Sequence, residues 1–215
     1  MGVGYRLYRY ALEVNELASY LSAKTAAAVD VRMSGALYPI MSVAGSGNHG
    51  IISTVPLAAY SEKTDNDRDL LVRSVTLSML LTIYSTYYVG YLSPACGCAT
   101  KAGVGITAGL AYYMSNGDAD AVKRSIKNFV AGIPGVICDG AKATCAIKLA
   151  AITCSAFQSA LTANMNMTAP NFGIVGKTPE ESIKNMAKTI SAMKNIDAVI
   201  IDQILKNHEN VKIES

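Results

Sequence analysis

The chain has 215 residues, of which 51% are hydrophobic and only 16% charged, and its net charge is +3 at pH 7. A chain this apolar can bury a full core, which excludes intrinsic disorder. Its lysines and arginines form no block of the kind that a nucleic-acid surface needs, so we expect no nucleic-acid partner. The low charge instead predicts a homo-oligomer, because exposed apolar surface favours self-association.

The compartment and membrane signals point to a cytoplasmic protein. Residues 1–20 carry charges throughout and contain no apolar stretch like that of a secretory signal. Five cysteines without a disulfide-like spacing fit a compartment where thiols stay reduced. The uncharged segment from Ser74 to Thr100 is long enough to span a membrane. Its many hydroxyl side chains favour a buried helix, so we expect no membrane partner.

Helix-forming residues dominate the chain and strand signals are scarce, so the predicted fold class is all-α, a compact multi-helix domain with glycine-rich loops. The predicted helices are, in chain order, 5–31, 50–60, 66–92, 99–115, 118–130, 144–164 and 179–206, the last broken near Asn195. The predicted glycine-bearing interruptions are 44–50, 93–105 and 132–145. These loops lie in the part of the chain with least charge, and we expect the functional site there.

Four of the five cysteines fall in these loops, Cys96 and Cys98 in one and Cys138 and Cys145 in the next. On one continuous helix the α-carbons of Cys138 and Cys145 would lie about 10.5 Å apart. Gly140 can break such a helix and fold both thiols onto one centre. Cys145 would then stand near a helix start, whose free amides favour thiolates.

The cysteine pattern allows several interpretations. Buried apolar cysteines are one, since this residue type is often buried. A metal or cluster site is another, because thiolates are soft ligands. A structural zinc is less favoured, since the paired C-x2-C spacing and a nearby histidine are both missing. Cys154 lies half a helical turn away from Cys145, which predicts a plain core cysteine.

The segment Gly45-Ser46-Gly47-Asn48-His49-Gly50 precedes an apolar helix. Glycines allow close backbone approach, and the following helix start offers free amides to a carboxylate or phosphate. A tight turn between helices explains the segment equally well. His49 could act as an acid or base, but a lone histidine is more often a hydrogen-bonded spacer.

Three stretches together resemble the family of iron–sulfur L-cysteine desulfidases and L-serine dehydratase α-domains. They are VDVRMSGALYPIMSVAGSGNHGI (29–51), LSPACGCATKAGVGITAGLAY (92–112) and GIPGVICDGAKATCAIKLA (132–150). The segment CDGAKATCAIK is the most specific and is nearer the desulfidase branch. The resemblance implies that residues 1–215 form a single helical domain like the serine dehydratase α-domain, with the N-terminal half of the family absent.

The resemblance implies a [4Fe-4S] cluster held by Cys98, Cys138 and Cys145, with Cys96 as the alternative to Cys98. Three protein ligands would leave one iron open as a Lewis acid. The implied activity is that of a lyase that eliminates the β-substituent of a small amino acid. L-Cysteine, converted to pyruvate, ammonia and sulfide, is the first candidate, and L-serine is the second. The residues implied to bind this substrate are Ser46, Gly47, Asn48 and His49.

The resemblance leaves the catalytic base unassigned. In the family, the residue thought to take the α-proton is a cysteine of the N-terminal half, so a separate N-terminal subunit is an expected partner. Neither His49 nor Tyr91 is assigned as the base, and Lys101 or Lys142 could balance charge near the cluster. The alternative function is that of a non-catalytic metal-binding or oligomerisation domain.

Overall fold

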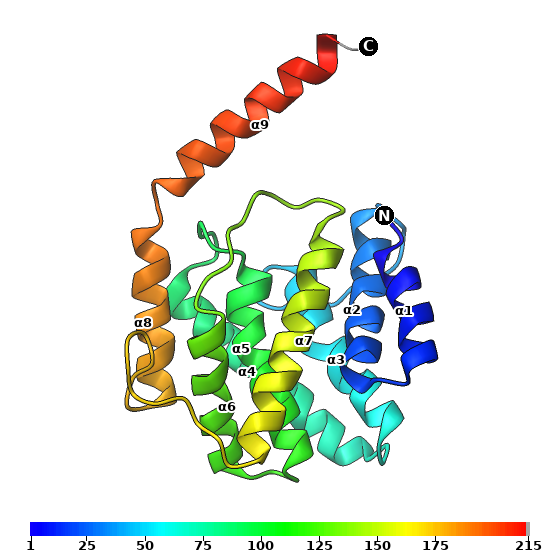
Figure 1. The fold of residues 1–215 in the computed structure, drawn as a ribbon, viewed down its shortest axis with the longest axis vertical. Helices are drawn as coiled ribbons and strands as arrows, with labels where there is room; N and C mark the ends of the chain where they lie inside the picture. The colour runs from blue at the N-terminus through cyan, green and yellow to red at the C-terminus, as the bar shows by residue number, and fades with distance from the viewer. Residues whose placement is uncertain (214–215) are drawn as a thin grey trace.

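The computed structural model describes the backbone of residues 1–213 and the side chains of residues 1–207. Within them the chain forms nine α-helices and no β-strand, which confirms the all-α class (Figure 1). The helices are α1 (Val3–Val14), α2 (Leu17–Met33), α3 (Gly47–Lys63), α4 (Arg68–Val89), α5 (Gly97–Met114), α6 (Ala119–Gly132), α7 (Cys145–Asn164), α8 (Pro179–Ala192) and α9 (Ile196–Ile213).

Helix α5 lies at the centre of the core and packs against α3, α4, α6 and α7. Its glycines allow this close packing. A Cβ on Gly103 would overlap the ring of Phe129, and one on Gly109 would lie 2.9 Å from the Ser74 carbonyl oxygen. The prediction of a loop running to residue 105 is therefore wrong. Helix α5 already begins at Gly97, and its glycines serve helix contact rather than chain reversal.

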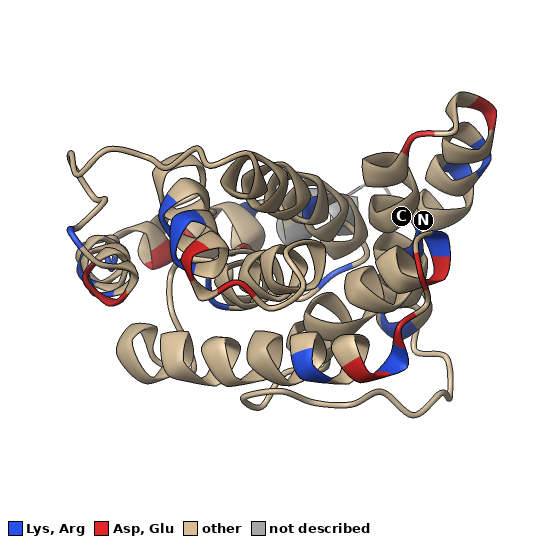
Figure 2. Cartoon of the chain, turned by 90° about the horizontal axis from the view of Figure 1, so that it is seen from below, with Lys and Arg blue, Asp and Glu red and all other residues tan. Residues whose placement is uncertain are grey.

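Helix α4 reverses the usual distribution of polarity. Its buried side chains are mostly hydroxyls, while the exposed face carries Leu80, Ile83 and Tyr87. Small hydroxyl side chains let α4 approach the glycines of α5 closely, so packing outweighs hydrophobicity in choosing the inner face. The prediction of a buried helix is thus only half right, and residues 74–89 form the uncharged, tan length of α4 in Figure 2.

Two helices of the described chain, α4 and α7, are long and apolar enough to cross a membrane by composition. This is weak evidence for a membrane protein, because core helices of soluble proteins pass the same test. Helix α7 packs against α2, α5 and α6, as a core helix does.

Two predicted breaks in the helices have different outcomes. The single helix predicted for 5–31 is wrong, because Asn15 adopts a left-handed conformation and the Glu16 carboxylate accepts hydrogen bonds from the amides of Ala18 and Ser19 to begin α2. The break predicted near Asn195 is confirmed between α8 and α9. Beyond it, α9 extends away from the other helices (Figure 1).

Candidate metal and substrate site

A cavity of about 340 Å³ lies where α3, α5 and α7 begin. Its lining unites two groups of predicted residues that are far apart in the sequence. These are the cysteines Cys96, Cys98, Cys138 and Cys145 and three residues of the glycine segment, Ser46, Asn48 and His49. Gly47 lies between Ser46 and Asn48 without lining the cavity itself.

The two cysteine-bearing loops are joined by backbone hydrogen bonds. The Cys96 amide donates to the Val136 carbonyl at 2.6 Å, and the Cys138 amide donates to the Pro94 carbonyl at 2.9 Å. Ala95 and Ile137 thereby form an antiparallel bridge. Because both cysteines belong to this bridge, their α-carbons are held at fixed positions beside the start of α5.

The segment between Cys138 and Cys145 folds as its glycine predicted. Residues 133–144 are not helical, Gly140 has a φ of 94°, and Cys145 is the first residue of α7. The Cys145 sulfur accepts a hydrogen bond from the Lys142 amide at 3.5 Å. The left-handed glycine thus turns the chain so that both thiols face the same cavity.

The cysteine thiols influence one another's ionisation. A hydrogen bond from Cys96 stabilises the Cys98 thiolate and lowers the pKa of Cys98, although burial opposes this shift. A hydrogen bond with Cys96, together with burial, raises the pKa of Cys138 well above its usual value. Cys98 also feels the charges of both Cys138 and Cys145. It therefore lies near both of the other predicted ligands.

Lys101 contributes a buried positive charge to this thiol-rich cavity. Its side chain is 1% exposed, and Nζ donates to the carbonyl oxygens of Gly90 at 2.7 Å and Tyr91 at 3.1 Å. No carboxylate of the described residues forms an ion pair with it. Burial lowers the pKa of Lys101, and the charges of neighbouring cysteines oppose that shift. An anion in the cavity would neutralise the buried ammonium.

The other predicted charge-balancing residue, Lys142, pairs with the Asp139 carboxylate and does not line the cavity. Lys148, which is not among the predicted residues, does line it. Its Nζ lies 2.9 Å from the Ile137 carbonyl oxygen and 3.2 Å from an Asp139 carboxylate oxygen. Lys101 and Lys148 are therefore the two lysines placed to act on an anion there.

The predicted glycine loop is in part a helical turn. Ser46 accepts a hydrogen bond from the His49 amide at 3.4 Å and caps α3, so α3 begins at Gly47 rather than near residue 50. Before it, Val43 and Ser46 exchange two backbone hydrogen bonds of 3.1 Å across a tight turn. Gly47, Asn48 and His49 are thus the first turn of a helix, with amides facing the cavity end.

His49 is 4% exposed, and its Nδ1 lies 3.2 Å from the Val43 carbonyl oxygen. This contact places the proton on Nδ1 and leaves a lone pair on Nε2. Burial and the neighbouring Lys101 charge lower the pKa of His49 to about 4. The imidazole is therefore neutral at pH 7 and a weak base, which supports a positioning role.

Asn48 and Arg32 complete the wall beside the glycine segment. Asn48 is 4% exposed, and its Oδ1 has no hydrogen-bond partner among the described residues. Arg32, in the last turn of α2, also lines the cavity but is not among the predicted site residues. It falls within the stretch 29–51, and its position just before a glycine-rich anion-binding pattern is the signal that could have identified it.

The four cysteines are the soft donors of the cavity. No three His, Cys, Asp or Glu side chains in the described part of the chain lie close enough together to hold one ion, which disfavours the zinc alternative. A cluster distributes its thiolate ligands over several irons and so needs wider spacing. Four thiols beside two lysines and helix starts suit such an anionic group.

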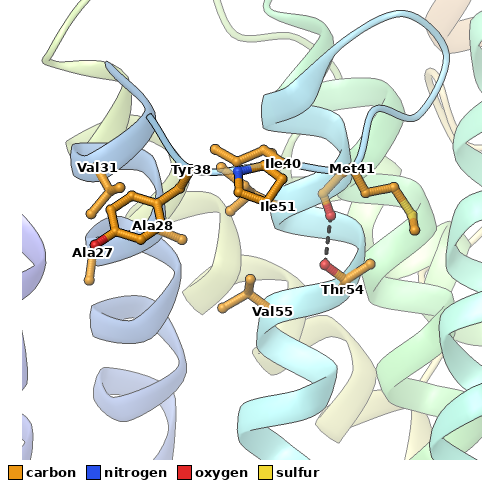
Figure 3. A pocket seen from close by; sticks show the side chains of 11 residues that line it. Ala27, Ala28, Val31, Tyr38, Ile40, Met41, Ile51, Thr54 and Val55 are labelled. Carbon is orange, nitrogen blue, oxygen red and sulfur yellow. Dashed lines mark hydrogen bonds between the residues drawn. The ribbon is translucent and has the colours of Figure 1, made fainter. Parts of the chain in front are cut away.

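A second cavity of about 440 Å³ lies between α2 and α3 under residues 38–41 (Figure 3). Its wall is mainly aliphatic, and the Thr54 hydroxyl is already bonded to the Gly50 carbonyl at 2.8 Å. No cysteine, histidine or charged side chain lines it. It therefore lacks the nucleophilic and charged side chains that line the cysteine-containing cavity.

The protein is thus an all-α protein with four cysteines, three helix starts and a buried lysine around one cavity. Residues 2–202 match the family described as serine dehydratase alpha chain. The chain belongs to this family.

Several relatives are similar to this chain. A UPF0597 protein of Caldanaerobacter subterraneus is 44% identical over 208 residues, covering 96% of this chain and 48% of the relative. L-Cysteine desulfidase of Methanocaldococcus jannaschii is 43% identical, covering 90% and 48%. L-Cysteine desulfidase of Methanococcus maripaludis is 41% identical, covering 89% and 47%. The family thus includes lyases.

The chain spans about half the length of these relatives. No solved structure matches it.

Proposed function

We propose that this chain is the cluster-bearing part of a lyase that eliminates the β-substituent of L-cysteine, with L-serine as the second candidate substrate. The cavity lined by four cysteines, with Lys101 and Lys148 beside them, is the observation that carries the proposal. Membership of a family that includes L-cysteine desulfidases supports it. The products from L-cysteine would be pyruvate, ammonia and sulfide.

Cys98, Cys138 and Cys145 would hold a [4Fe-4S] cluster. The resemblance favours Cys98, and Cys96 stays the alternative because it shares side-chain hydrogen bonds with both Cys98 and Cys138. When bound, such a cluster supplies an open iron that polarises the substrate's β-substituent as a Lewis acid. Lys101 would balance its negative charge from a position fixed by the Gly90 and Tyr91 carbonyls.

The first turn of α3 would orient the substrate. Ser46 fixes the start of the helix by accepting from the His49 amide, and the amide of Asn48, which lines the cavity, would bind an anionic group. His49 holds the turn against Val43 through Nδ1. Because His49 is a weak base, the proton acceptor would come from a separate N-terminal subunit, for which the greater length of the relatives leaves room.

Anaerobic reconstitution with iron and sulfide tests the cluster. We expect about four irons per chain and a broad absorbance band near 400 nm, as for a thiolate-bound cluster. Cys138→Ala and Cys145→Ala should lose iron, whereas Cys154→Ala, outside the cavity, should retain it. Wild-type chain without iron after reconstitution would contradict the proposal and favour a non-catalytic binding or oligomerisation domain.

Sulfide release from L-cysteine and pyruvate formation from L-serine test the reaction. Each is measured with the chain alone and after adding the remaining half of a desulfidase relative. We expect turnover only in the mixture and faster with L-cysteine, whose soft thiol suits iron. A cluster-loaded mixture that processes neither amino acid would contradict the lyase assignment while leaving the cluster established.

Self-association and a cytoplasmic location are parts of the same proposal. Exposed apolar side chains on α4, such as Leu80 and Ile83, and on α9, such as Ile201 and Leu205, support an oligomer. Light scattering after size-exclusion chromatography should give at least twice the chain mass of 22.7 kDa. A monomer at micromolar concentration would contradict this part.

A further inference from the structure

Two strong hydrogen-bond donors in the wall of the cavity share one weak acceptor. Arg32 Nη1 lies 3.5 Å from the Met33 sulfur, and Asn48 Nδ2 lies 3.7 Å from the same atom. A thioether sulfur is a poor acceptor compared with a carboxylate oxygen. Both donors would therefore gain from an anion that took the place of the sulfur.

The guanidinium of Arg32 has no anion of its own. It forms no ion pair with any carboxylate in the described part of the chain. It also lies against the first turn of α3, because a Cβ on Gly47 would be 2.5 Å from Arg32 Nε and 3.2 Å from Cζ. Gly47 thus allows the guanidinium to sit beside the free amides of that turn.

Asn48 supplies the complementary acceptor. Its Oδ1 is buried at the cavity and lacks a hydrogen-bond partner in the part of the chain that the structure describes. A buried amide oxygen without a donor costs stability, and a bound ammonium group would satisfy it. The Asn48 side chain would thus donate from Nδ2 to an anion and accept at Oδ1 from a cation.

We infer that Arg32 binds the carboxylate of an α-amino acid, beside Asn48, which the family resemblance already implies as a substrate-binding residue. Arg32 and Asn48 Nδ2 hold its carboxylate, and Asn48 Oδ1 accepts a hydrogen bond from its ammonium. The identity of the ligand as an amino acid rests on the proposed function, whereas the carboxylate site stands on the geometry of Arg32, Asn48 and Gly47. The site selects amino acids over amines or esters because each lacks one of the two charged groups or presents it differently.

Equilibrium binding separates this inference from turnover. The probes are L-alanine, which has both charged groups but no β-leaving group, and L-alaninamide, which lacks the carboxylate. Their binding to reconstituted full chain is measured by isothermal titration calorimetry. We expect wild type to bind L-alanine at least tenfold more tightly than L-alaninamide, as for a charge-assisted hydrogen bond worth about 1.5–3 kcal/mol.

Arg32→Gln should weaken L-alanine binding about tenfold to 100-fold and leave L-alaninamide binding nearly unchanged. Arg32→Lys should recover part of the loss, because lysine keeps the charge without the forked geometry. The matched control is Arg73→Gln on α4, whose guanidinium pairs with Asp69 at 2.8 Å far from these residues in sequence. It should bind both probes as wild type does.

Three outcomes would overturn the inference. They are equal binding of L-alanine by wild type and Arg32→Gln, equal weakening of both probes by the substitution, and no binding of L-alanine by wild type. Thermal unfolding of each variant shows whether it is folded, and Arg32→Lys serves if Arg32→Gln is not. Carboxylate-selective binding without sulfide release from L-cysteine would uphold this inference and contradict only the lyase proposal.

Discussion

The polar groups at the two ends of the parallel helices α3 and α5 differ in their hydrogen bonding. We call the end at Gly47 and Gly97 the starting end and the end at Lys63 and Met114 the finishing end. Where the helices finish, the Tyr113 hydroxyl donates to Asp65 Oδ1 at 2.6 Å and lies 2.9 Å from Ser61 Oγ. Where they begin, neither Asn48 Oδ1 nor the buried Lys101 ammonium has a partner carboxylate or donor side chain among residues 1–207. Helix α5 also starts without a side-chain cap.

This contrast indicates where the molecule retains binding capacity. A buried polar group without a partner lowers stability, so folded chains rarely keep several together. At the finishing end the polar groups stabilise the fold. The hydroxyls of Ser74 and Ser78 on α4 also lack partners among the described residues, so what distinguishes the starting end is that Asn48 and Lys101 line one cavity, where a ligand could complete them.

The largest expected effect on stability comes from adding a Cβ atom where α3 packs closely against the segment before it. A Cβ on Gly50 would overlap the backbone carbonyl of Met41, which cannot move aside as a flexible side chain could. We expect Gly50→Ala to lower the free energy of unfolding by about 4 kcal/mol. Chemical denaturation followed by circular dichroism measures it.

The control is Gly132→Ala at the end of α6, where an added Cβ meets no atom within 4 Å. Alanine is the better helix former, so this variant should be unchanged or slightly more stable. An equal loss of unfolding free energy in Gly50→Ala and Gly132→Ala would show that the contact between Gly50 and Met41 does not determine the effect.

The next effect is a pH dependence caused by His49. Its pKa in the folded chain is about 4 against an ordinary 6.5, so as the pH falls through this window the unfolded chain takes up the proton first. The stability contributed by neutral His49 is thus complete above about pH 6.5 and is lost toward pH 4, a change of about 3 kcal/mol.

Urea unfolding at pH 7 and pH 4 of wild type and His49→Gln isolates this contribution. Glutamine does not titrate, so the variant should lose about 3 kcal/mol less stability than wild type between the two pH values. Parallel losses in both proteins would mean that His49 is not held neutral by its surroundings.

Much of the fold was predictable from local signals. The helix class, the break near Asn195 and the reversal at Gly140 follow from composition, glycine placement and cap residues. The start of α3 was not placed correctly, because three glycines suggested a loop whereas the Ser46 cap outweighs them. The inner face of α4 could not be read from hydrophobicity, since contact with the glycines of α5 determines it.

The residues of the candidate site were likewise predictable only in part. The cysteines and the glycine segment are visible as motifs, and the structure brings them to one cavity. Arg32 and Lys148 fall within the stretches 29–51 and 132–150, but nothing in the sequence distinguishes them from the other charged residues there. Their importance depends on where folding places their charges, because Lys148 lines the cavity while paired with Asp139 and Arg32 lines it without a carboxylate among the described residues.

At the finishing end we expect a modest effect from Tyr113→Phe. The substitution removes the hydroxyl that bonds Ser61 and Asp65, which should cost about 1 kcal/mol. The hydrogen bond from Tyr113 also lowers the pKa of Asp65, so that pKa should rise in the variant, as NMR titration can measure. Tyr112→Phe is the control, because the Tyr112 hydroxyl forms no hydrogen bond within the described residues.

The smallest effect on stability and iron content is expected at Cys154. This cysteine tests whether iron binding depends on where a cysteine lies in the fold or only on how many cysteines the chain has. Cys154 lies on α7, nine residues after Cys145, and is half-buried outside the cavity rather than in the core as predicted. Burial raises the pKa of its thiol, which disfavours the thiolate that iron needs. Cys154→Ala should change the free energy of unfolding by less than about 1 kcal/mol and leave the iron content unchanged. Iron loss equal to that of Cys145→Ala would mean that the cluster is not confined to the starting end of α5 and α7.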